Sequence, residues 1–215
     1  MEKIVRRLET ETEARRTQFR EGFTDFARRH DLVDWEGWFS PYAPEIYEAV
    51  LDHVTPDDVV LEIGAGDLRL ALQLAQRAQR VIAVEVNPLV VGSALETIGL
   101  NLPSNLQVMC ANALDIAIPS DVSAAVLLMR HCRHFALYFD RLEAAGCERL
   151  ITNARWKSGV ECVDLAEPRV SFGSVECGLY ACRCGAVGAV LEGDSNGARV
   201  SEVESCPHCD PTLAQ

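Results

Sequence analysis

The sequence has no long hydrophobic run. No window reaches about 18 uninterrupted apolar residues, the length that a membrane-spanning helix needs, so neither a transmembrane segment nor a membrane partner is expected. The N-terminal stretch MEKIVRRLETETEARR is charged throughout and lacks the apolar core of a secretory signal. We therefore expect a cytoplasmic protein.

An excess of positive charge is also absent. The chain carries 20 Lys and Arg against 32 Asp and Glu, a net charge of −12. This balance argues against a whole surface devoted to nucleic acid. The charge is unevenly spread, however, because residues 128–157 contain five arginines and one lysine. A local basic face that binds RNA through this stretch therefore stays open.

The pattern that is present predicts an α/β fold. With 215 residues, 48% of them apolar, the chain can bury the core of one medium domain. Continuous apolar runs alternate with helical ones, which predicts a Rossmann-like parallel sheet with helices on both faces. Residues 2–30 are charged with sparse apolar positions and predict a surface helix or a helix pair. The expected strands are 59–63, 80–86, 106–110, 124–129 and 149–152, and the expected helices begin near Pro44 or span 68–78, 88–98 and 136–145.

A glycine turn marks the first strand-to-helix junction. Gly64 and Gly66 would let the backbone approach a ligand closely, at the edge of the sheet where such folds bind ligands. The next strand ends in Glu85, whose carboxylate suits the hydroxyls of a ribose. Arg69 stands where a dinucleotide-binding turn has its third glycine. The turn therefore favours a nucleoside over a pyrophosphate, and it disfavours a nicotinamide-dependent oxidoreductase.

The run VLEIGAG at 60–66, with VEVN at 84–87, resembles the class I S-adenosylmethionine-dependent methyltransferases, and within that class the ribosomal RNA adenine dimethylases. The resemblance covers about residues 40–155. It implies that the glycine turn faces the methionine part of the cofactor and that an acid after the second strand holds the ribose. Residues implied to bind the cofactor are Glu62 (supporting the turn), Gly64, Gly66, Glu85, and Asn112, which stands where the family has an aspartate for the adenine amino group.

Tyr42 is a further candidate for the cofactor pocket. It belongs to an aromatic segment with Trp35, Trp38 and Phe39, just before the α/β fold begins. In the class that the sequence resembles, an N-terminal segment often caps the cofactor cleft. Ordinary packing is the alternative, because aromatic side chains dominate buried contact area.

The catalytic motif of the adenine-modifying members is missing. Their Asn-Pro-Pro-Tyr-like motif follows the fourth strand, where this chain has MRHCRHF at 129–135. His131 or His134 could take a proton from the acceptor, because histidine titrates near neutral pH. Arg130 could hold a carboxylate or phosphate of the acceptor. The alternative is that these are polar residues of an ordinary loop.

Nine cysteines without a secretion signal are better explained as thiols or metal ligands than as disulfides. Two close pairs, in CRCG and CPHC, predict a closed tetrahedral zinc site of structural type. Cys177 or His208 could replace one ligand. The acidic surroundings favour a protein partner or a purely structural role for this segment. The predicted ligands are Cys182, Cys184, Cys206 and Cys209.

These patterns together predict three parts: an N-terminal helical cap (1–43), a methyltransferase-like domain (44–176) and a zinc-ribbon-like module (177–215). The expected function is methyl transfer from S-adenosylmethionine to an unidentified acceptor, which could be RNA, protein or a small molecule. The alternative is an inactive methyltransferase-like scaffold that binds partners through its zinc module.

Overall fold

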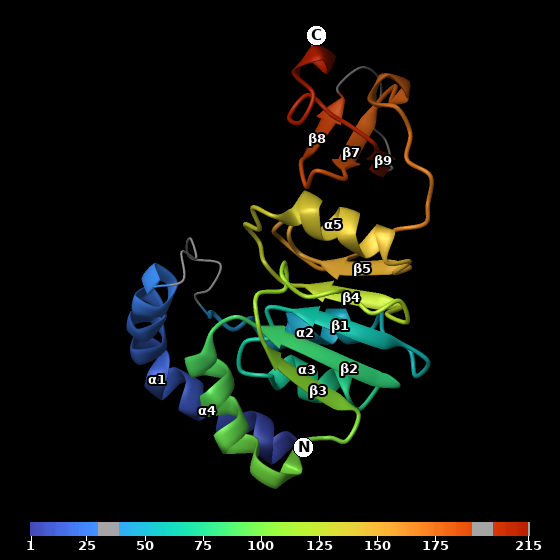
Figure 1. Cartoon of the computed structure of the whole chain (residues 1–215). Coiled ribbons are helices and arrows are strands. Elements are labelled where there is room, and N and C mark those ends of the chain that lie inside the picture. The colour runs from blue at the N-terminus through green and yellow to red at the C-terminus, as the bar shows by residue number, and fades with distance from the viewer. Residues whose placement is uncertain (30–38, 191–199, 215) are drawn as a thin grey trace.

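The computed structural model describes residues 1–29, 39–190 and 200–214. Its centre is a six-stranded sheet in the order β3-β2-β1-β4-β5-β6, shown in Figure 1. The first five strands pair in parallel, which confirms the predicted α/β sheet, and β6 pairs antiparallel to β5. The strands are β1 Val59–Ile63, β2 Arg80–Glu85, β3 Leu106–Cys110, β4 Ala124–Leu127, β5 Arg149–Thr152 and β6 Glu161–Asp164.

Helices cover both faces of this sheet. One buried cluster joins alternate strand residues such as Val60 and Val81 to α2, α3 and α4. The opposite residues, such as Leu61, pack against α5 in a second cluster. This alternation follows from strand geometry, since successive side chains point to opposite faces. The helices are α1 Glu2–Arg29, α2 Pro44–Leu51, α3 Arg69–Leu74, α4 Pro88–Ile98 and α5 Phe135–Ala144, with short 3-10 turns at Gly99–Asn101, Phe172–Ser174 and Pro211–Leu213.

The charged N-terminal segment forms one long helix. Along α1 the buried residues Leu8, Phe19 and Phe23 recur at helical spacing, and the helix runs beside α4 (Figure 1). Thr12 donates a hydrogen bond of 2.6 Å to the carboxylate of Asp67. The helix is therefore tied to the glycine turn that follows β1.

A small second sheet, in the order β8-β7-β9, lies beyond α5 near the C-terminus (Figure 1). Its β7 pairs antiparallel with β8 and parallel with β9. Residues 191–199, which connect the two cysteine pairs, lie outside the described part of the chain. The strands are β7 Gly178–Cys182, β8 Val187–Val190 and β9 Val200–Val203.

Most element boundaries agree with the sequence. The main differences are that the helix expected to reach residue 78 ends at Leu74, and that the strand expected to reach Met129 ends at Leu127. The residues that follow β4 line the candidate site described below. Within the described ranges, no helix combines the length and apolar character needed to cross a bilayer.

Candidate functional site

The glycine turn leaves β1 in a conformation that favours glycine. Gly64 and Gly66 have φ angles of 77° and 56°, a region that other residues enter only at a steric cost. The N–H groups of Gly64 and Ala65 donate to the carbonyl of Val84, at 2.8 and 3.0 Å. A Cβ on Gly66 would lie 2.1 Å from the ring of Phe39. Both the backbone and the close ring therefore require glycine at this position.

Glu85, the last residue of β2, fixes the turn from the other side. Its carboxylate accepts hydrogen bonds of 2.8 Å from the N–H of Gly66 and of 2.8 Å from that of Asn87. Burial raises the pKa of Glu85, and these backbone hydrogen bonds oppose that rise. The residue is 6% exposed and lines the cavity above the turn. Its remaining acceptor capacity can therefore serve a ligand in that cavity.

Glu62 presents a second buried carboxylate to the same cavity. It is 4% exposed, and its Oε2 atom has no hydrogen-bond partner among the described residues. Burial, followed by the charges of Asp67 and Glu85, raises the pKa of Glu62 well above its ordinary value. A buried acceptor without a donor costs free energy, so this atom is suited to a ligand that brings a hydrogen-bond donor or a positive charge.

The cavity has a volume of about 490 Å³. It opens at the carboxyl ends of β1, β2 and β4, where parallel sheets bind their ligands. The segment from Phe39 to Ala43 and the residues after β4 complete its wall. The structure thus brings together on this wall six residues predicted from the sequence: Tyr42, Glu62, Gly64, Glu85, Arg130 and His131.

Tyr42 organises the side of the cavity that carries Arg130. Its hydroxyl accepts a hydrogen bond of 3.4 Å from the backbone N–H of Arg130, and the Arg130 guanidinium lies 5.2 Å from the Tyr42 ring centroid. The N–H of Tyr42 donates to the hydroxyl of Tyr47 at 3.1 Å. No carboxylate of the described residues forms an ion pair with Arg130, so its charge can meet an anionic ligand.

Three predicted residues do not line this cavity. Gly66 lies against Phe39, and His134 is exposed at the N-terminal cap of α5. Asn112 lies in the turn after β3, where its side-chain oxygen accepts a hydrogen bond of 3.0 Å from the N–H of Leu114. Trp35 and Trp38 lie outside the described residues.

Sequence reasoning missed Tyr47 as part of the cavity wall. The available signal was its spacing, because Tyr47 precedes the buried Val50 and Leu51 by three and four residues on the face of α2 that looks inward. Phe39 was treated as one member of an aromatic segment. Its contact with Gly66 joins residues 27 positions apart, and no local pattern reports such a contact.

The arginine-rich stretch 128–157 exposes only part of its positive charge, which reduces the local basic face that the sequence leaves open. Three of its five arginines are used within the fold, while Arg130, Arg133 and Lys157 are exposed. An RNA interface through this stretch would have to use those three exposed cations. The internal contacts are those of Arg141 with the carbonyls of Ala113, Leu114 and Ile116, of Arg149 with Asp58 and the carbonyl of His53, and of Arg155 with Glu161 and Glu202.

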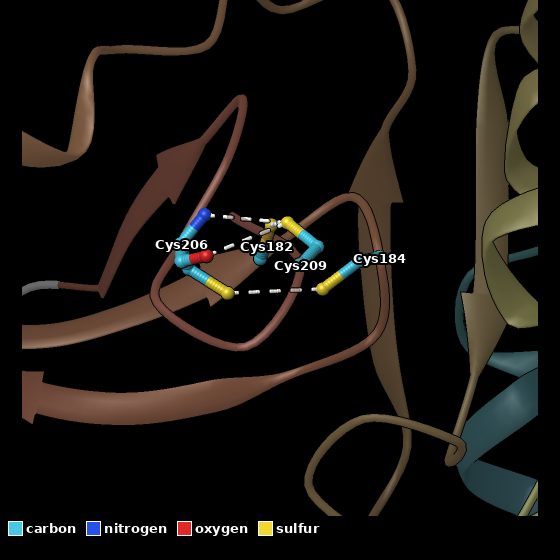
Figure 2. Close-up of side chains that lie close together, drawn as sticks. All are labelled: Cys182, Cys184, Cys206 and Cys209. Atoms are coloured by element: carbon cyan, nitrogen blue, oxygen red, sulfur yellow. Dashed lines mark hydrogen bonds between the residues drawn. The ribbon is translucent and has the colours of Figure 1, made fainter. Parts of the chain in front are cut away.

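The four predicted metal ligands come together at one end of the small sheet (Figure 2). Their Sγ atoms lie within 4.8 Å of one another. The Sγ atoms of Cys184 and Cys206 are 3.7 Å apart, and those of Cys182 and Cys209 are 3.8 Å apart. A tetrahedral zinc site with Zn–S bonds of about 2.3 Å has sulfur–sulfur edges of about 3.8 Å. The donor set and its spacing therefore fit zinc, and in the described chain neither Cys177 nor His208 belongs to this cluster.

The segment of this chain that carries the glycine turn is similar in sequence to known proteins. Residues 56–127 match the family model described as "Putative methyltransferase". The "Probable ribosomal RNA small subunit methyltransferase A" of Methanosarcina mazei is 38% identical over 91 residues, which are 42% of this chain and 30% of that protein. The corresponding protein of Streptomyces avermitilis is 43% identical over 54 residues, 25% of this chain and 18% of its own. The chain thus spans less than a third of the length of these relatives.

Solved structures match about half of this chain. The 23S rRNA methyltransferase ErmE is 25% identical, with a TM-score of 0.46 over 53% of this chain and 46% of its own. The tRNA (m1A58) methyltransferase TrmI of Aquifex aeolicus is 18% identical, with a TM-score of 0.47 over 53% and 47% of the two chains. The α/β part of this chain is therefore similar, over residues 56–127, to a family described as putative methyltransferases, and it is similar to the ribosomal RNA small subunit methyltransferases.

Proposed function

We propose that the protein transfers a methyl group from S-adenosylmethionine to an acceptor bound beside the cavity. The observation that carries this proposal is the cavity itself, which presents two buried carboxylates and a glycine turn at the carboxyl ends of adjacent strands. When bound, S-adenosylmethionine supplies an activated methyl group on a positively charged sulfur. The carboxylates of Glu62 and Glu85 suit that positive charge. The Oε2 atom of Glu62 can accept a hydrogen bond from the ammonium group of the methionine part.

In this proposal each cofactor residue has a defined task. Glu85 accepts hydrogen bonds from the ribose hydroxyls, Gly64 leaves the space above the turn free of a side chain, and Gly66 lets the Phe39 ring lie against the turn. Tyr42 covers the cavity from the N-terminal segment. Asn112 contacts the adenine amino group only if the cofactor extends beyond the cavity to the turn after β3, where the amide oxygen has a second lone pair beyond the one that Leu114 uses.

The acceptor side consists of Arg130 and His131. Arg130, held by Tyr42, binds an anionic group of the acceptor, and His131 takes the proton from the attacking atom. His134 would play this part only if the loop before α5 moved, because it does not line the cavity. Ribosomal RNA is the acceptor that the names of the relatives favour. With this set of groups a catalytically inactive scaffold is the less favoured function.

The C-terminal cysteine cluster is proposed to hold one structural zinc ion. The four cysteine sulfurs would fill all four coordination positions of a zinc ion, which leaves no open position for a substrate. In this proposal the chain divides into a helical cap (1–43), a methyltransferase domain (44–176) and a zinc module (177–215). About one zinc per purified chain supports the site, and a folded protein without metal contradicts it.

The function is tested by transfer of a radiolabelled methyl group from S-adenosylmethionine to a ribosomal RNA transcript. We expect labelled RNA with the wild-type protein, and loss of labelling with Arg130→Ala or His131→Ala. Arg80→Ala serves as the control, because Arg80 pairs with Asp121 at the opposite edge of the sheet. A protein that binds the cofactor but labels no RNA under low-salt conditions would contradict the RNA assignment.

A further inference from the structure

The loop that carries the first two metal ligands packs against the helix that follows the acceptor segment. Gly185 follows Cys184 with a φ angle of 95°. A Cβ built on Gly185 would lie 3.0 Å from the ring of Phe135 and 3.2 Å from its Cβ. The backbone of the cysteine loop therefore rests directly on the first residue of α5.

Arg183, between the two ligands of the same loop, strengthens this contact. Its guanidinium donates hydrogen bonds of 2.7 Å to Asp140 and of 3.0 Å to Glu143, both on α5. It also pairs with Glu204, near the second pair of cysteines, and lies 5.5 Å from the ring centroid of Phe139. One side chain thus joins both halves of the metal site to α5.

The helix α5 in turn positions the acceptor side of the cavity. Phe135 is 3% exposed, and the partly buried Met129 and Cys132 pack into the same cluster. Arg130 and His131 lie between Met129 and Cys132 and line the cavity. A shift of Phe135 would therefore move both residues, because tightly packed interiors transmit displacement.

The two carboxylates of the cofactor side have no such dependence. Glu62 and Glu85 lie on β1 and β2, and their hydrogen bonds and nearest charges come from the glycine turn and from residues 86 and 87. Among the described residues, neither carboxylate forms a hydrogen bond or ion pair with residues 178–190 or 200–214. These two carboxylates are therefore held independently of the metal-binding loop, while Tyr42 and Gly64 contact the acceptor segment at Arg130 and Met129.

We propose that the metal-binding loop is a positioning element for the acceptor segment, so that metal occupancy holds residues 129–144 in place through Arg183 and the contact of Gly185 with Phe135. Arg183 is then a positioning residue, acting through α5 rather than on the substrate. The part of this inference that concerns methyl transfer rests on the proposed function, while the mechanical coupling does not. Loss of the metal would loosen the acceptor side and spare cofactor binding.

The test is hydrogen exchange measured by mass spectrometry on the full chain, with zinc bound and after chelation. We expect chelation to raise exchange in peptides covering 129–144 about five- to tenfold, since it releases contacts to charged groups. Peptides covering 80–98, in β2 and α4, should not change. Titration with S-adenosylmethionine, run in parallel, should give the same affinity in both states.

Arg183→Ala separates the coupling from the metal itself. This variant should keep its zinc yet show faster exchange in 129–144 than the zinc-bound wild type, and chelation should raise the exchange further to the level of the chelated wild type, because the contact of Gly185 with Phe135 depends on the metal alone. Arg183→Lys, which keeps the charge but not the planar fork, should restore part of the protection. Arg80→Ala is the matched control for losing a surface arginine and should behave as the wild type.

Two results would overturn the inference: unchanged exchange in 129–144 after chelation and in Arg183→Ala, or an equal rise in 80–98 that indicates general unfolding. Failure of the proposed function gives a different result. In that case S-adenosylmethionine does not bind in any state, while the exchange measurement still decides the coupling.

Discussion

Replacing Arg155 by methionine should cost this protein more stability than the loss of a surface arginine. The side chain is 1% exposed and donates four hydrogen bonds of 2.6–3.0 Å to the carboxylates of Glu161 and Glu202. Burial disfavours its charge, but the hydrogen bonds to Glu202 and Glu161 raise the pKa of Arg155 above its ordinary value. The arginine is therefore the shared cation of two acids on β6 and β9.

Arg155→Met leaves these two carboxylates facing each other without a cation. Removing one partner of a buried ion pair costs about 3–5 kcal/mol. The carboxylate side chains are 19% and 18% exposed, so water can relieve part of the cost and we expect a loss near the lower end, about 3 kcal/mol. Urea unfolding followed by circular dichroism measures this loss as a change in the free energy of unfolding.

The triple variant Arg155→Met/Glu161→Gln/Glu202→Gln should recover part of the loss, because it removes the uncompensated charges. Arg80→Met, which breaks a surface pair, should cost at most about 1 kcal/mol. If Arg155→Met were no more destabilising than Arg80→Met, Arg155 would not be the buried link described above. The conclusion that Arg155 stabilises the fold, and does not belong to an RNA-binding face, would then be refuted.

Two further substitutions test the cavity. Gly66→Ala should lower the free energy of unfolding by about 1–2 kcal/mol and weaken cofactor binding, because residue 66 has a φ of 56° and the Phe39 ring would lie 2.1 Å from the new Cβ. Gly92→Ala is the control, because a Cβ at that position meets no atom within 4 Å and should not destabilise the protein. Equal effects at the two positions would contradict this reasoning. Burial raises the pKa of Glu62, so cofactor affinity should be full above that raised pKa and fall as the pH drops through it. In Glu62→Gln this pH dependence should vanish, and an unchanged profile measured by calorimetry would exclude Glu62 as its source.

Much of the α/β core could be predicted because it depends on local patterns. The strand at 59–63 and the helix at 88–98 have the predicted bounds. The first is a short apolar run between a turn and the glycines. The second begins at a proline after Asn87, whose side chain accepts hydrogen bonds from the first turn of the helix.

Contacts between distant residues explain what sequence reasoning missed. Arg149 reaches Asp58 across 91 positions and Arg155 reaches Glu202 across 47, so their charges suggested an exposed basic stretch. The packing of Gly185 on Phe135 is likewise invisible to spacing, because it depends on how the small sheet meets α5. The metal cluster was predictable since its four ligands form two close pairs in the sequence.

The central claim is that the cavity binds S-adenosylmethionine through Glu85. Calorimetric titration of the purified protein with S-adenosylmethionine, repeated on Glu85→Ala, tests it most directly. The account predicts binding of about one molecule per chain in the wild type, and a loss of affinity of at least about tenfold in the variant, since a buried charged hydrogen-bond acceptor is removed. Absence of binding to the wild type, or equal binding to both proteins, would contradict it.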